Sequence, residues 1–221
     1  MKLRSLQEFE DAIDRETAWR KRELSTVLSQ ARAARTPLQP TALRSGVALL
    51  YAHWEGWIKR VAEMYIDFVG QQRLAHDQLS APFLALALKV RISDLIEAKS
   101  VGLHVAFAEF LQADLSTRAR LVGQGHVRTE SNLSSAVLRD IVDRLGLDYQ
   151  PYELQKQLID QRMVETRNHV AHGEYLDVSL ADFETLHDEV SRMLRVFTAD
   201  VLNHAALKNY RAPGATIPVG P

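Results

Sequence analysis

Apolar side chains recur every three or four positions over most of this sequence, which is the spacing of one buried face on an α-helix. The pattern is clearest between Leu43 and Val69, where the apolar positions are Leu50, Trp54, Trp57, Ile58, Val61, Tyr65 and Phe68. A second stripe follows Ser179, at Phe183, Leu186, Val190, Leu194, Phe197 and Val201. Both segments are predicted to be long helices that bury one face each.

Capping residues and helix breakers set the limits of the other predicted helices. Ser5 with Glu8 has the spacing of a capping box, and Ser134 is a predicted N-cap. Gly146 and Gly173 stand where helices should end. The chain has 10 Gly and 7 Pro among 221 residues, and so few breakers favour long helices. Further helices are expected over residues 5–34, 82–98, 103–111, 134–145 and 151–172, with a polar loop over most of 116–131.

These patterns predict an all-α fold. No segment shows the alternating pattern of a strand, so we expect a bundle of long antiparallel helices. A single domain is expected over 1–212, in which the N-terminal helix 5–34 packs on a core of 41–205. The Pro- and Gly-rich residues 213–221 are predicted to form a flexible tail.

Composition narrows the classes of function. The chain has 27 Lys and Arg against 28 Asp and Glu, so a nucleic-acid site would have to be local. It has no Cys, which excludes disulfides, thiol nucleophiles and thiolate metal ligands. The charged N-terminal segment and the absence of a run of 18 apolar residues predict a soluble, cytoplasmic protein.

One segment, 164–175, carries candidate chemistry. It places Arg167, Asn168, His169 and His172 near a predicted helix end, whereas the Gly-rich phosphate loops, HExxH and GxSxG are all missing from the sequence. Arg167 and His172 are five positions apart, which is about 140° of rotation on an ideal helix. They could converge on one phosphodiester if the helix packs beside its twin in a dimer.

The residue types in this segment suit RNA cleavage. RNA carries its own nucleophile, the 2′-hydroxyl, and histidine titrates near neutral pH. Arginine presents a planar donor fork to phosphate oxygens, and Asn168 could orient either group. This route needs no metal and no cofactor. Spacing alone leaves a purely structural alternative open, because Arg and His are also favourable at a helix C-terminus.

The surrounding residues carry a family resemblance. The segment Arg167–Glu174 resembles the R-N-x-x-x-H signature of the HEPN superfamily (higher eukaryote and prokaryote nucleotide-binding domains). Tyr51–Lys59, YAHWEGWIK, resembles the aromatic-rich helix of its bacterial MAE-type subgroup, which includes the RiboL-PSP-HEPN proteins. Residues 131–133, Leu138 and 146–147 are similar to that subgroup as well, and the resemblance covers about 43–197.

The resemblance implies a helical bundle that dimerises through the motif-bearing helices and acts as a metal-independent endoribonuclease. By position, Arg167 matches the motif arginine, Asn168 the polar residue after it, and His172 the motif histidine, whereas His169 falls at a variable position. The implied partners are RNA, a second copy, and an antitoxin or other protein of a toxin–antitoxin, restriction-linked or anti-phage system. Some members have lost catalysis, so a non-catalytic module that binds RNA, nucleotide or a partner protein is the alternative.

Several residues outside the motif are further candidates. Glu55 could orient Arg167 or a histidine from a neighbouring helix, or it could instead pair with Lys59. The aromatic residues beside it, Trp54 and Trp57, could stack on bases, although their apolar stripe favours the core. A group of basic side chains, Arg118, Arg120 and Arg128, is a candidate RNA-backbone contact, with a solvated loop as the alternative.

Overall fold

The computed structural model describes residues 3–97, 100–130 and 132–214. In chain order, their helices are α1 (Leu6–Ala33), α2 (Gln39–Gln71), the 3₁₀ helix η1 (His76–Gln78), α3 (Ala81–Glu97), α4 (Val101–Ala113), α5 (Ser135–Arg144), α6 (Gln150–Glu153), the π-helix η2 (Leu158–Glu165), α7 (Thr166–Ala171) and α8 (Leu180–Ala206). Isolated bridges are the only β pairing across these described ranges. The predicted all-α fold is confirmed, while residues 215–221 of the predicted tail lie outside the described residues.

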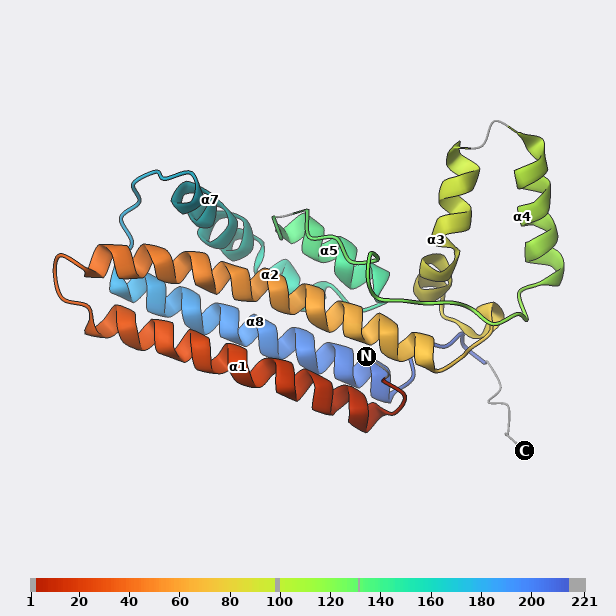
Figure 1. The fold of residues 1–221 in the computed structure, drawn as a ribbon, viewed down its shortest axis with the longest axis horizontal. Coiled ribbons are helices and arrows are strands. Elements are labelled where there is room, and N and C mark those ends of the chain that lie inside the picture. The colour runs from red at the N-terminus through yellow and green to blue at the C-terminus, as the bar shows by residue number, and fades with distance from the viewer. Residues whose placement is uncertain (1–2, 98–99, 131, 215–221) are drawn as a thin grey trace.

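Three long helices, α1, α2 and α8, lie side by side and enclose most of the core (Figure 1). Helix α1 runs antiparallel to the other two, whereas α2 and α8 run in the same direction, because the chain between them is long enough to return to the same end. Trp54 and Trp57 are 0% and 3% exposed, and the Trp57 Nε1–H donates to Thr198 Oγ1 at 3.1 Å. Both side chains therefore belong to the core, which rules out base stacking on them.

Helix starts follow local capping chemistry. The predicted capping box forms, since Glu8 N donates to Ser5 Oγ and Ser5 N donates to Glu8 Oε2, each at 3.1 Å. Helix α2 begins at Gln39, four residues before the predicted Leu43, because proline is tolerated in a first helical turn.

The predicted continuous helix over 151–172 is wrong. Helix α6 ends at Glu153, a turn follows, and the chain then enters η2, whose backbone hydrogen bonds have the wider π spacing, before α7 continues it. Tertiary anchors explain the break. The Tyr152 hydroxyl donates to Asp200 of α8 at 2.6 Å, whereas Asp160 of η2 is bound to the start of α5.

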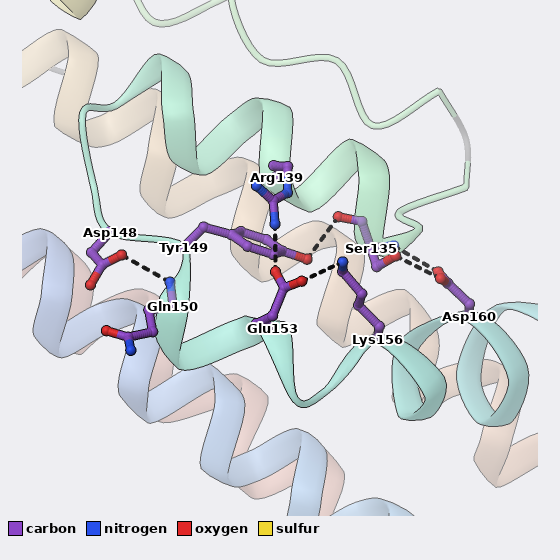
Figure 2. A network of polar contacts seen from close by, with 8 residues as sticks. All are labelled: Ser135, Arg139, Asp148, Tyr149, Gln150, Glu153, Lys156 and Asp160. Carbon is purple, nitrogen blue, oxygen red and sulfur yellow. Dashed lines mark hydrogen bonds and ion pairs between the residues drawn. The ribbon is translucent and has the colours of Figure 1, made fainter.

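A polar network fixes η2 against α5 (Figure 2). Asp160 accepts hydrogen bonds from Ser135 N at 2.7 Å and from Ser135 Oγ at 2.6 Å. Nearby, Glu153 pairs with Arg139 and Lys156. Because α7 continues directly from η2, this network sets the direction in which α7 presents its side chains.

After α4, residues 114–130 run beside α2 towards α5 (Figure 1). The approach is close, since a Cβ on Gly123 would lie 2.1 Å from the carbonyl oxygen of Glu63, so this position requires glycine. Gly123 N also donates to Asp67 Oδ1 at 2.8 Å. These contacts hold the segment on α2 and bring Thr129 against Glu55.

Helices α3 and α4 form a hairpin that projects from one end of the bundle (Figure 1). Much of its apolar surface faces solvent, including Val90, Ile96, Val101, Leu103 and Val105, which are 49–81% exposed. Among the described residues, no helix combines the length and the apolar character needed to cross a membrane.

Candidate functional site

Helix α7 places Arg167 against α2. The Arg167 Cζ lies 4.2 Å from the centroid of the Tyr51 ring, and Nη2 lies 3.7 Å from Glu55 Oε2. Nη1 also donates to Asn168 Oδ1 at 2.9 Å. The Arg167 and Glu55 side chains are 23% and 20% exposed, so the guanidinium lies at the edge of the core, within reach of solvent. We call Tyr51, Glu55, Thr129, Arg167 and Asn168 the arginine cluster.

Contacts from the segment before α5 hold the α2 side of this cluster. Thr129 Oγ1 donates to Glu55 Oε1 at 2.5 Å, and Leu133 N donates to the Tyr51 hydroxyl oxygen at 2.6 Å. Burial raises the pKa of Tyr51 to about 12, and the Glu55 carboxylate adds to that rise, so this tyrosine stays neutral at physiological pH. The ring and the carboxylate that face Arg167 are thus both fixed by hydrogen bonds.

This arrangement suits binding of a phosphate. The ring face attracts the cation and the nearby carboxylate balances its charge, so the guanidinium is held in one place without being removed from water. A planar guanidinium oriented in this way can donate two parallel hydrogen bonds to phosphate oxygens.

His172 lies at the other end of α7 and is organised differently. It is the C-cap residue, and its backbone N–H donates to Asn168 O at 2.9 Å. Gly173 follows with φ of +75°, which ends the helix in the left-handed conformation that glycine favours. The His172 side chain is exposed and forms no hydrogen bond or ion pair with the residues that the structure describes. Its imidazole is therefore accessible to a substrate or to another protein chain.

His169 lies between these two ends and has carboxylate neighbours. Its Nδ1 pairs with Glu174, and its Nε2 lies 4.0 Å from Glu165 Oε1. Arg44 of α2 donates to the carbonyl oxygen of Glu174 at 2.9 Å, which ties the residues after α7 to the bundle. The paired imidazole is half exposed and does not contact Arg167 through any of these bonds.

The three basic candidates of the loop do not lie together. Arg118 and Arg120 are exposed, and Arg118 is paired with Ala75, which follows the end of α2 and is 20 positions from Glu55. Arg128 is next to Thr129 and lines a polar groove of about 1020 Å³ between α2 and residues 121–130. Thr129, Lys59 and Arg60 line the same groove, which therefore adjoins the arginine cluster.

The structure thus brings Glu55, Arg167 and Asn168 together and places His169 and His172 further along the same helix. Their catalytic roles, and the RNA contacts of the three loop arginines, stay predictions. Sequence reasoning missed Tyr51 and Thr129. The sequence does contain a signal for Tyr51, because this residue precedes Glu55 by four positions and therefore shares its helix face. The sequence contains no such signal for Thr129, because only the folded loop brings this residue to α2.

Metal ligands are a separate question. Among residues 3–97, 100–130 and 132–214, no group of three or more His, Asp or Glu side chains is arranged to hold a metal ion.

Comparison with protein families gives a match over nearly the whole chain. The model described as HEPN_MAE_28990-like HEPN aligns with residues 9–210, a range that contains the arginine cluster, His169 and His172, all of α2 and α8, and α1 except its first turn. Comparisons with curated proteins and with solved structures find no match. With its all-α bundle, its arginine cluster and a family match of this extent, the chain belongs to the HEPN_MAE_28990-like family of HEPN domains.

Proposed function

We propose that this protein is a metal-independent endoribonuclease of the HEPN type. The observation that carries the proposal is the position of Arg167, held at the protein surface by Tyr51, Glu55 and Asn168 on the helix that also carries exposed His172. Phosphate recognition and proton transfer near neutral pH are the two tasks that RNA cleavage requires, and these two side-chain types perform them.

The proposed reaction is an internal transfer of the phosphoryl group. The 2′-oxygen of RNA attacks the adjacent phosphorus, the bond from phosphorus to the 5′-oxygen breaks, and the products carry a 2′,3′-cyclic phosphate and a 5′-hydroxyl. A histidine removes the proton of the 2′-hydroxyl or supplies one to the leaving 5′-oxygen. Arg167 binds the phosphate oxygens and stabilises the charge that develops on them, and Asn168 positions either group.

The site is proposed to be completed by a second copy. Arg167 faces α2, whereas His172 is the C-cap residue five positions later, a spacing of about 140° of rotation on an ideal helix. Pairing of two α7 helices would bring the imidazole of one copy towards the guanidinium of the other. We therefore propose a homodimer with two composite sites.

The wider role that we propose is that of a toxin or effector in a bacterial toxin–antitoxin, restriction-linked or anti-phage system. Such an enzyme needs a partner protein that controls it. The exposed apolar side chains of the α3–α4 hairpin favour a protein contact of this kind. The same observation favours the second candidate function, a non-catalytic module that binds RNA or a protein without cutting RNA.

Cleavage of RNA in the presence of EDTA tests the proposal. The purified protein should cut single-stranded RNA, and Arg167→Ala and His172→Ala should each lower the rate on the order of 100-fold or more. Arg22→Ala and His104→Ala are matched controls at exposed positions of α1 and α4, and they should keep the parental rate. RNA binding without cleavage would favour the non-catalytic module, and a rate that EDTA abolishes would require a metal mechanism.

A further inference from the structure

A second groove opens beside the first, between α3, α5 and the segment that precedes α5. Its volume is about 530 Å³, and its polar lining consists of Lys89, Ser93, Arg128, Glu130, Asp140 and Arg144. It shares Arg128 and Glu130 with the larger groove, which reaches Thr129 of the arginine cluster. The two grooves therefore share Arg128 and Glu130, and the larger one reaches Thr129, whose hydroxyl donates to Glu55 beside Arg167.

The positive charges of this second groove are only partly neutralised. Arg144 Nε pairs with Asp140 Oδ2 at 2.6 Å. Lys89 Nζ donates to the carbonyl oxygen of Gly125 at 3.4 Å, which is a neutral acceptor. Arg128 forms no ion pair with the residues that the structure describes. Of the three cationic side chains in the groove, Arg144 is thus the one that is paired with a carboxylate among the described residues.

The three cationic side chains lie close enough to affect one another, because all of them line the same groove. The pKa of Lys89 is lowered by burial and then by the positive charges of Arg144 and Arg128. The pKa of His126 is likewise lowered by burial and then by Lys89 and Arg144, and its buried Nδ1 has no hydrogen-bond partner among the described residues. Like charges gathered in this way repel one another, and an anion bound among them would relieve that repulsion.

We propose that Lys89, Arg128 and Arg144 bind backbone phosphates of the RNA strand whose scissile linkage is held at Arg167. This assignment rests on the proposed function, because it takes RNA as the substrate. The groove volume is that of a site for a small ligand, so it fits one or two nucleotides of a single strand. Glu130 and Asp140 limit the attraction, and the site therefore binds a small number of phosphates at defined positions.

The test measures binding of a fluorescein-labelled single-stranded RNA of about 20 nucleotides to the full chain that carries His172→Ala, so that the probe stays intact. In that background, Arg128→Ala and Lys89→Ala should each raise Kd by about three- to tenfold at moderate salt. The slope of log K against log salt should become shallower by about 0.7 for each phosphate that the variant no longer binds. Arg22→Ala, at an exposed position on α1, should change neither quantity.

The outcomes separate the groove from the proposed chemistry. If Kd and the salt slope of both groove variants equal those of Arg22→Ala, or if the parent binds no RNA, the groove assignment is overturned. Arg128 is an exposed loop residue, so its variant keeps the test valid even if Lys89→Ala unfolds. If groove variants weaken binding but no variant of Arg167 or His172 changes cleavage, the catalytic proposal and the link from the groove to Arg167 both fail, and only the binding of RNA phosphates by the groove stands.

Discussion

The two ends of the motif on α7 differ in how the chain holds them. Arg167 has a ring, a carboxylate and an amide around its guanidinium, and the Tyr51 and Glu55 groups are in turn fixed by Leu133 and Thr129. Five residues later, the His172 side chain is exposed, with no bond to the described residues. The fold itself thus orients the group proposed to bind phosphate, whereas the group proposed to move protons must be positioned by a second copy or by RNA.

The largest predicted effect tests whether the two ends act across a dimer. Arg167→Ala and His172→Ala are each expected to be inactive, but a mixed dimer would contain one intact composite site. Co-refolding equal amounts of the two variants should restore about a quarter of the parental rate, since half of the dimers are mixed and each has one working site. The rate of RNA cleavage before and after mixing measures this recovery.

The control is each variant refolded alone at the same total protein concentration. A mixed sample that cuts RNA no faster than the sum of its two components would mean that guanidinium and imidazole act within one chain.

The next effect concerns the contacts that hold Arg167. Glu55→Gln keeps the acceptor oxygen for Thr129 but removes the charge that faces the guanidinium at 3.7 Å. Because small displacements of a positioning group are costly, kcat should fall on the order of 10-fold. Glu97→Gln, at an exposed position of α3, is the matched control, and steady-state kinetics on RNA compares them. A kcat for Glu55→Gln within twofold of the control would show that this carboxylate does not position Arg167.

A third prediction separates stability from activity. Tyr51→Phe keeps the ring under Arg167 but leaves Leu133 N without its acceptor, so at pH 7 unfolding should become easier by about 1–3 kcal/mol while the cleavage rate changes little. The pKa of Tyr51 is raised from 10 to about 12 in the folded chain. The contribution of this neutral hydroxyl to the free energy of unfolding of the parent is therefore fully present below pH 10 and is lost between pH 10 and 12. The variant should lose less stability over that window.

Urea unfolding at pH 7 and across pH 10–12 measures both parts of this prediction, with Tyr175→Phe at a 77% exposed position as the control. Equal losses of stability from pH 10 to 12 in the parent and in Tyr51→Phe would contradict the assigned pKa.

The smallest effect is expected at the pair of His169 and Glu174. The pair is exposed, and exposed ion pairs contribute about 0–1 kcal/mol, so Glu174→Gln should leave the melting temperature and the cleavage rate almost unchanged. If Glu174→Gln slows cleavage as much as His172→Ala does, then His169 is the imidazole that acts on RNA, and the role assigned to the exposed helix end is wrong.

Local rules predicted those parts of the fold that depend on local interactions. The capping box at Ser5 and the apolar stripe around Trp54 were correct because each follows from side chains a few positions apart. The single helix over 151–172 was wrong because its interruption depends on Tyr152 reaching α8 and Asp160 reaching α5. Neither contact leaves a periodic signal in the sequence.

The candidate site divides in the same way. Arg167, Asn168 and His172 could be named as candidates because they lie within six residues, and Glu55 because it stands on the clearest predicted helix. Thr129 and the groove cations Lys89 and Arg144 were not found, because three separate segments come together only in the folded chain. Apolar composition was also a poor guide to burial for α4, which is largely exposed, in contrast to α2.

The most direct test of the central claim is whether cleavage uses the 2′-hydroxyl. A mapped RNA substrate should be compared with the same RNA carrying a single 2′-deoxy substitution on the 5′ side of the cut linkage, with EDTA present, and the product ends identified by mass spectrometry. Attack by the 2′-oxygen predicts 2′,3′-cyclic phosphate and 5′-hydroxyl ends from the unmodified RNA and no cut at the substituted position. Cleavage of the substituted RNA, or products with 3′-hydroxyl and 5′-phosphate ends, would contradict it.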